Sequence, residues 1–162
     1  MEYVGAHVIF HRRVSTALGD SVQVVLLCKR TQDAPTDPGK WSFFGGTREE
    51  LDGGDPARTA VREVAEELTV SIDVDELEYV ERFAVPADPE TFHVEIFASE
   101  LRQAMDTLTL RRAAPGEIVE GEGLAWFIAE ETRALDLRAT DRKALAAFFG
   151  QRKKCGADLG QG

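Results

Sequence analysis

The segment from Trp41 to Leu68 restricts the possible folds of this chain more than any other. It opens with an aromatic stretch ending in Gly45-Gly46, a pattern typical of a short strand followed by a tightly turning loop. Asp55-Pro56 then predicts a helix start, because Asp is a favoured N-cap and Pro fits the first helical position. A buried helical stripe is predicted from the spacing of Ala57, Ala60, Val61, Val64 and Leu68. A strand, a glycine loop and an amphipathic helix therefore follow one another directly.

The same helix carries a cluster of glutamates. Glu63 precedes Glu66 and Glu67 by one helical turn, so we expect three carboxylates along one flank of the apolar stripe. Like charges at this spacing repel each other. A hard divalent cation such as Mg²⁺ neutralises them best, because Mg²⁺ prefers carboxylate oxygens as ligands. A Glu-rich helical face alone also fits an ordinary solvated surface. The glycine loop before the helix favours a site for phosphate and metal instead.

The remaining segments predict one domain of alternating strands and helices. Its length of 162 residues fits a single core, with a domain over 1–152 and a flexible, Gly-rich C-terminal tail over 153–162. Alternating or continuous apolar runs predict strands at 3–11, 22–30, 77–85, 92–98 and 123–128. Helices are expected over 129–135 and from Thr140, as the N-cap, to about Arg152.

Charge and composition exclude several classes of function. The net charge of −10 argues against a polymeric nucleic-acid partner, because such binding depends on Lys and Arg. A small phosphorylated ligand remains compatible if a cation bridges it to the protein. No apolar run approaches the roughly 18 residues of a membrane span, and the first residues lack a secretory signal, so we expect a cytoplasmic protein. Cys28 and Cys155 are interpreted as free thiols.

The acidic segment resembles the Nudix box. That pattern reads Gly, five residues, Glu, seven residues, then Arg-Glu-apolar-x-Glu-Glu-x-Gly-apolar. The stretch from Arg62 to Val70 matches its second half at all but one specified position. The likeness extends to the apolar strand ending at Arg30 and to the acidic loop before Trp126. It implies an α/β fold, the Nudix-type α/β/α sandwich with a mixed sheet.

The sequence departs from the box in its first half and at its end. Gly54 stands where the pattern, counted back from Arg62, has its first glutamate, and the loop from Gly46 to Gly54 is two residues too long. If that loop folds back, Glu49, Glu50 or Asp52 can replace the lost carboxylate, and the sequence does not choose among them. Thr69 replaces the glycine that caps the helix in a left-handed conformation, so a different helix end is expected.

The resemblance also implies residue roles. Glu63, Glu66 and Glu67 are expected to bind Mg²⁺, with Mn²⁺ as an alternative, while Glu63 and Glu67 take part in catalysis. Arg62 is expected to pair with a box carboxylate and hold the loop on the helix. Glu120 is a candidate for a further catalytic base, with Glu122 as the alternative.

Three further expectations concern the ligand and the assembly. Gly45, Gly46 and Arg30 are candidate substrate-binding residues, although a basic residue at a strand end is also commonly just solvated. The implied activity is hydrolysis of a diphosphate linkage in a nucleoside diphosphate derivative or a similar small nucleotide. The alternative is a non-catalytic module of the same fold that binds a nucleotide metabolite. Dimers are common among relatives, so a homodimer is open to this chain.

Overall fold

A mixed seven-stranded sheet forms the centre of the molecule. The computed structural model describes residues 3–86, 91–104, 107–110 and 121–158. The strands are β1 (Tyr3–Ser15), β2 (Ser21–Arg30), β3 (Trp41–Ser42), β4 (Phe44–Thr47), β5 (Glu78–Pro86), β6 (Thr91–Glu100) and β7 (Gly121–Ile128). They follow the order β3-β2-β1-β6-β5, with β4 paired to β1 and β7 to β2. Only the β1–β6 pairing is parallel among these strands.

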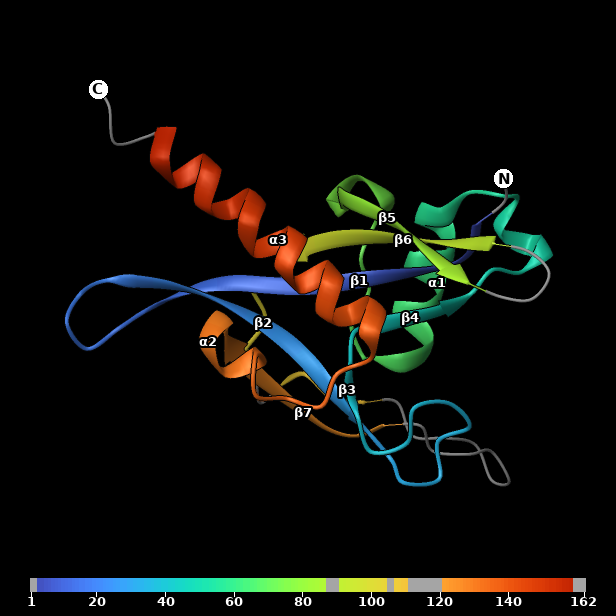
Figure 1. Cartoon of the computed structure of the whole chain (residues 1–162), viewed down its shortest axis with the longest axis horizontal. Coiled ribbons are helices and arrows are strands. Elements are labelled where there is room, and N and C mark those ends of the chain that lie inside the picture. The colour runs from blue at the N-terminus through green and yellow to red at the C-terminus, as the bar shows by residue number, and fades with distance from the viewer. Residues whose placement is uncertain (1–2, 87–90, 105–106, 111–120, 159–162) are drawn as a thin grey trace.

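Helices cover both faces of this sheet (Figure 1). They are α1 (Pro56–Glu67), α2 (Ala129–Thr132) and α3 (Ala139–Asp158), with short 3-10 turns η1 (Glu50–Asp52) and η2 (Val74–Glu76). In the view of Figure 1, α3 crosses in front of the sheet and α1 lies behind it. The expected α/β/α sandwich with a mixed sheet is therefore confirmed.

Alternation along β1 builds a separate apolar core on each face. Val8 and Phe10 are fully buried in the core that includes Val64 of α1. Ile9, between them, is fully buried in the other core, with Phe148 of α3. The central strand is thus apolar on both sides because it is covered on both sides.

Some expected element bounds were wrong. β1 continues to Ser15 and pairs with β2 through Ser15 and Ser21, which makes a longer hairpin than the apolar runs indicate. Thr140 lies inside α3, which begins at Ala139, so it is not the N-cap. α3 also continues to Asp158, beyond its expected end near Arg152, while the flexibility of 153–162 stays a prediction. None of the helices in the described ranges is long and apolar enough to cross a lipid bilayer.

Candidate active site

Helix α1 begins where the sequence predicts. The Asp55 side chain accepts a hydrogen bond of 2.9 Å from the Ala57 backbone N–H, and Pro56 opens the helix. One side of α1 buries Ala60 and Val64 against the sheet. This docking places Glu63, Glu66 and Glu67, the glutamate flank of α1, beside β4.

Two glycines of β4 allow the chain to approach β1 and α1 closely. β4 pairs with β1, where Gly45 lies opposite His7 and Gly46 opposite Ala6. A Cβ atom on Gly45 would lie 2.2 Å from the Ala6 carbonyl oxygen, and its φ of 138° also requires glycine. A Cβ atom on Gly46 would lie 2.5 Å from Oε2 of Glu63. The Glu63 carboxylate therefore packs directly on the Gly46 backbone.

Arg62 connects the carboxylates of the box to one another. Its Nε and Nη2 donate to the two oxygens of Asp52, at 3.0 and 3.1 Å. Nη2 also donates to the Thr47 carbonyl at 2.8 Å. Nη1 donates to Glu63 at 2.9 Å and to both oxygens of Glu66, at 3.2 and 3.3 Å. Every nitrogen of the guanidinium thus donates to an acceptor, and these contacts hold the loop before α1 against the helix.

Asp52 is the acid that pairs with Arg62, which resolves the alternatives left by the sequence. Its side chain is 1% exposed, whereas that of Glu49 is 54% exposed and lies 3.6 Å from Nη1. Glu50 is exposed, with no described contact to Arg62. The hydrogen bonds from Arg62, together with those from Glu49 N–H and the Thr59 hydroxyl, hold the pKa of Asp52 well below its usual range.

The spacing of the box explains why counting back from Arg62 misplaced this carboxylate. Asp52 follows Gly46 at the spacing that the pattern gives its first glutamate, so the spacing of the first half is kept when counted forward from the glycine, with aspartate in place of glutamate. The two extra residues lie after it. Gly53 and Gly54 have φ angles of 64° and 77°, and this left-handed backbone carries the chain from η1 to the Asp55 cap.

The other two glutamates of the flank have different surroundings. Glu67 accepts a hydrogen bond of 2.9 Å from the Gly45 N–H, which joins the end of α1 to β4. Glu66 is 56% exposed and contacts Arg62. Burial raises the pKa of Glu63, against the opposing effect of Arg62.

Burial, and next the charge of Glu67, raise the pKa of the free Cys28 thiol to about 12, so this thiol is protonated at neutral pH.

The donor chemistry of this flank fits a hard divalent cation. Glu63, Glu66 and Glu67 offer only carboxylate oxygens, and position 46 has no side chain that would displace the Glu63 carboxylate. Within the ranges that the structure describes, no three acidic, histidine or cysteine side chains already surround one point. Glu63 and Glu66 accept from Arg62, and Glu67 accepts from the Gly45 N–H. A carboxylate has more acceptor sites than these bonds use, so a shared ion would require the three side chains to move toward one point without leaving these partners.

The remaining candidate residues are Arg30 and Glu122, whose charges act on Cys28 together with that of Glu67, and Glu120. Arg30 is 7% exposed and donates from Nε to the Thr36 carbonyl at 2.9 Å, so it is not simply a solvated strand end. Glu122 is exposed on β7. Glu120 lies outside the described residues.

The end of α1 is built without a left-handed residue, as the sequence led us to expect. The C-cap Leu68 is extended, with φ −117° and ψ 159°. The Thr69 N–H donates to the Thr109 carbonyl at 3.0 Å, and the two hydroxyls lie 2.9 Å apart. A partner segment thus replaces the glycine cap.

Comparison with known proteins places this geometry in a family. The model of the NUDIX domain matches residues 9–148. No curated protein sequence matches the chain significantly. Similar solved structures include the NUDIX domain of Shewanella oneidensis NrtR complexed with ADP ribose, at 13% identity and a TM-score of 0.68 over 93% of this chain and 88% of that chain. MutT protein from Methanosarcina mazei shares 17% identity, with a TM-score of 0.66 over 94% of this chain and 96% of that chain. A C. elegans Ap4A hydrolase binary complex shares 19% identity, with a TM-score of 0.65 over 93% of this chain and 97% of that chain. At these identities the structural likeness shows the fold.

Proposed function

The chain belongs to the Nudix family, and from this premise we propose that it is a Mg²⁺-dependent hydrolase of a diphosphate linkage in a small nucleotide derivative. The observation that carries the proposal is the glutamate flank of α1, in which Glu67 binds the Gly45 N–H and Glu63 packs on Gly46. Arg62 donates to Glu63 and Glu66 of the same flank. A module that only bound a nucleotide would have little use for three acids one helical turn apart on so constrained a backbone.

Each residue of the flank has a proposed role. Glu63, Glu66 and Glu67 would hold the divalent cation, which when bound neutralises phosphate oxygens and polarises the phosphorus under attack. Glu63 orients the attacking water and accepts its proton. The oxygen of that water bonds to phosphorus while the bond from phosphorus to the bridging oxygen breaks, which releases two phosphorylated products. Arg62 and Asp52 keep the glutamates in place.

The nucleotide class is proposed from similar structures, whose names include ADP ribose and Ap4A. Arg30, buried at the end of β2, and the backbone of Gly45 and Gly46 are the proposed substrate-binding groups. The cationic character of Arg30 suits phosphate oxygens. The Gly45 N–H already donates to Glu67, so the two glycines would contribute by letting a ligand approach the backbone closely.

The proposal is tested by turnover of ADP-ribose, diadenosine tetraphosphate and a nucleoside triphosphate, with Mg²⁺ and with a chelator. We expect turnover of at least one substrate that requires the cation. In Glu67→Gln, kcat should fall at least about 100-fold, because an amide cannot supply an anionic oxygen. The fold should persist, since the amide oxygen can still accept from the Gly45 N–H.

A matched control is Glu130→Gln, which changes the same chemistry on exposed α2 and should leave turnover unaltered. Equal losses in both variants, or none in Glu67→Gln, would contradict the assigned flank. A wild-type protein that turns over nothing, yet melts at a higher temperature with a nucleotide, would instead support the non-catalytic binding module.

A further inference from the structure

A buried hydrogen-bond chain runs from β1 to the Arg62 guanidinium. The Tyr3 hydroxyl lies 2.9 Å from the Thr59 hydroxyl, which donates to Oδ2 of Asp52 at 2.8 Å. Tyr3 is 7% exposed and Thr59 is fully buried. We propose that Thr59 and Tyr3 are positioning residues, which act through Asp52 and Arg62 on the glutamates of the flank. This inference rests on the proposed function.

The direction of each bond in this hydrogen-bond chain follows from which groups can donate. The Thr59 hydroxyl has two acceptors within reach, the Asp52 carboxylate at 2.8 Å and the Asp55 carbonyl at 3.5 Å. Its single hydrogen points at Asp52, because the shorter bond to a charged oxygen is the stronger one. Because this hydrogen is used, the Thr59 oxygen can only accept a hydrogen bond from Tyr3. The Tyr3 O–H therefore donates to Thr59. Each hydroxyl therefore has one preferred orientation, and Oδ2 of Asp52 is held by Thr59 as well as by Arg62.

The need for this support follows from the replacement in the box. Asp52 has one methylene fewer than the glutamate of the pattern, and two additional residues separate it from Arg62. Its Oδ2 accepts from the Glu49 N–H at 2.8 Å, from Thr59 and from Arg62, while Oδ1 accepts from Arg62. Thr59 is the one donor among these that comes from the buried side of α1.

The planar guanidinium of Arg62 links the position of Asp52 to the positions of Glu63 and Glu66. The guanidinium is planar, so two bonds to Asp52 fix the direction of Nη1. Nη1 donates to Glu63 and Glu66. A carboxylate of Asp52 that turned freely would therefore let Glu63 and Glu66 move together, although neither touches Thr59.

The test compares Thr59→Val, Thr59→Ser and Tyr3→Phe with wild type. Thr59→Val keeps the shape of the side chain and removes the hydroxyl, and we expect kcat to fall about 10- to 100-fold with little change in KM. Thr59→Ser restores the hydroxyl and should stay within about 3-fold of wild type. Tyr3→Phe should act in the same direction as Thr59→Val but less strongly. A second readout, independent of turnover, is the NMR signal of the Arg62 Nε–H, assigned by its loss in Arg62→Lys. This signal should shift and exchange faster with water in Thr59→Val and Tyr3→Phe.

Thr132→Val is the matched control, because Thr132 is 5% exposed and its hydroxyl donates to the Ala129 carbonyl at 2.8 Å, on another helix. It should change neither kcat nor the Arg62 signal. An Arg62 signal unaltered in both Thr59→Val and Tyr3→Phe would overturn the inference, whether or not turnover is found. If Thr59→Val does not fold, the Arg62 signal in Tyr3→Phe decides. A wild-type protein without turnover, in which the Arg62 signal still responds, would count against the proposed function alone.

Discussion

At the scale of single residues, the position of Glu63 depends on the absence of a side chain at Gly46. All three atoms of the Glu63 carboxylate lie 2.5 to 2.8 Å from the place where a Cβ atom on residue 46 would stand. No backbone atom lies as close to that point. A side chain there would therefore move the carboxylate while leaving the strand where it is.

We expect Gly46→Ala to lower kcat roughly 100-fold, because a displacement of about 1 Å at a reacting group has an effect of that size. The free energy of unfolding should change by less than about 2 kcal/mol, since a flexible side-chain end can turn away. Turnover assays and urea unfolding of the same preparation measure both effects. Gly123→Ala is the control, because nothing lies within 4 Å of its added Cβ atom. Full activity in Gly46→Ala would show that the placement of Glu63 has no effect on the reaction.

At the scale of elements, the conformation of the backbone determines which residue a position tolerates. Gly19, in the turn between β1 and β2, has a φ of 85°, whereas Gly150 lies inside α3. Neither has any atom within 4 Å of an added Cβ. The two positions thus differ in backbone conformation and not in available space.

The same substitution should therefore have opposite effects at these two glycines. Gly150→Ala should raise the free energy of unfolding by about 0.5 to 1 kcal/mol, because alanine loses less conformational freedom in a helix. Gly19→Ala should lower it by about 1 kcal/mol, because a left-handed backbone strains any residue with a Cβ atom. Urea unfolding of both variants measures the difference. A change of the same sign in both would contradict these backbone assignments.

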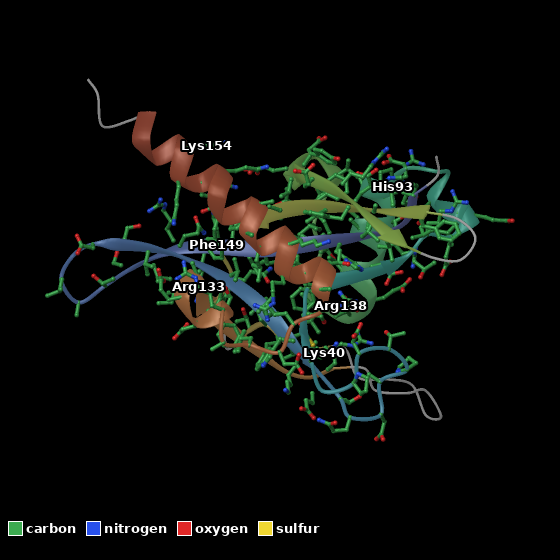
Figure 2. All side chains as sticks on the ribbon, in the orientation of Figure 1. Lys40, His93, Arg133, Arg138, Phe149 and Lys154 are labelled. Atoms are coloured by element: carbon green, nitrogen blue, oxygen red, sulfur yellow. The ribbon has the colours of Figure 1, made fainter. Side chains whose placement is uncertain are left out.

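At the scale of the whole molecule, α3 is tied to the strands that lead into the site. Asp141 is fully buried and accepts from the Phe43 N–H at 3.2 Å and from Arg138, labelled in Figure 2 at the N-terminal end of α3, at 2.9 Å. Phe43 precedes β4, which carries Gly45 and Gly46. The helix on one face of the sheet thus helps to hold the strand that contacts α1 on the other face.

Buried His7 makes the stability of the whole fold depend on pH. Burial, and then the charges of Arg138 and Arg30, lower the pKa of His7 to about 3. An unfolded chain binds this proton near pH 6.5, so its contribution to stability is present above about 6.5 and is lost as pH falls toward about 3. Between pH 7.5 and 5.5, we expect His7 to lower the free energy of unfolding by about 1.4 kcal/mol.

Urea unfolding at several pH values in this window measures that loss. The window avoids the titration of ordinary carboxylates. His7→Gln should flatten the profile by the share of His7, while the lowered pKa of His11 leaves a smaller slope in the same direction. A profile that His7→Gln leaves unchanged would show that His7 is not buried as a neutral group.

The sequence by itself determined the local elements and the acidic cluster. The Asp55 cap, the apolar stripe of α1 and the spacing of Glu63, Glu66 and Glu67 are all relations between residues a few positions apart. A helix converts such spacings into neighbouring side chains without help from the rest of the chain. The resemblance to the family, and with it the sandwich fold, could be read from the same short segment.

Only the tertiary structure decided which acid pairs with Arg62 and how α1 ends. Glu49, Glu50 and Asp52 lie within four positions, and their order along the chain does not reveal which one turns inward. That choice depends on contacts between distant segments, such as the bond from Tyr3 to Thr59, 56 positions apart. The end of α1 likewise depends on Thr109, which lies 40 positions beyond Thr69. Such contacts form only when the sheet brings these segments together, so local spacing does not predict them.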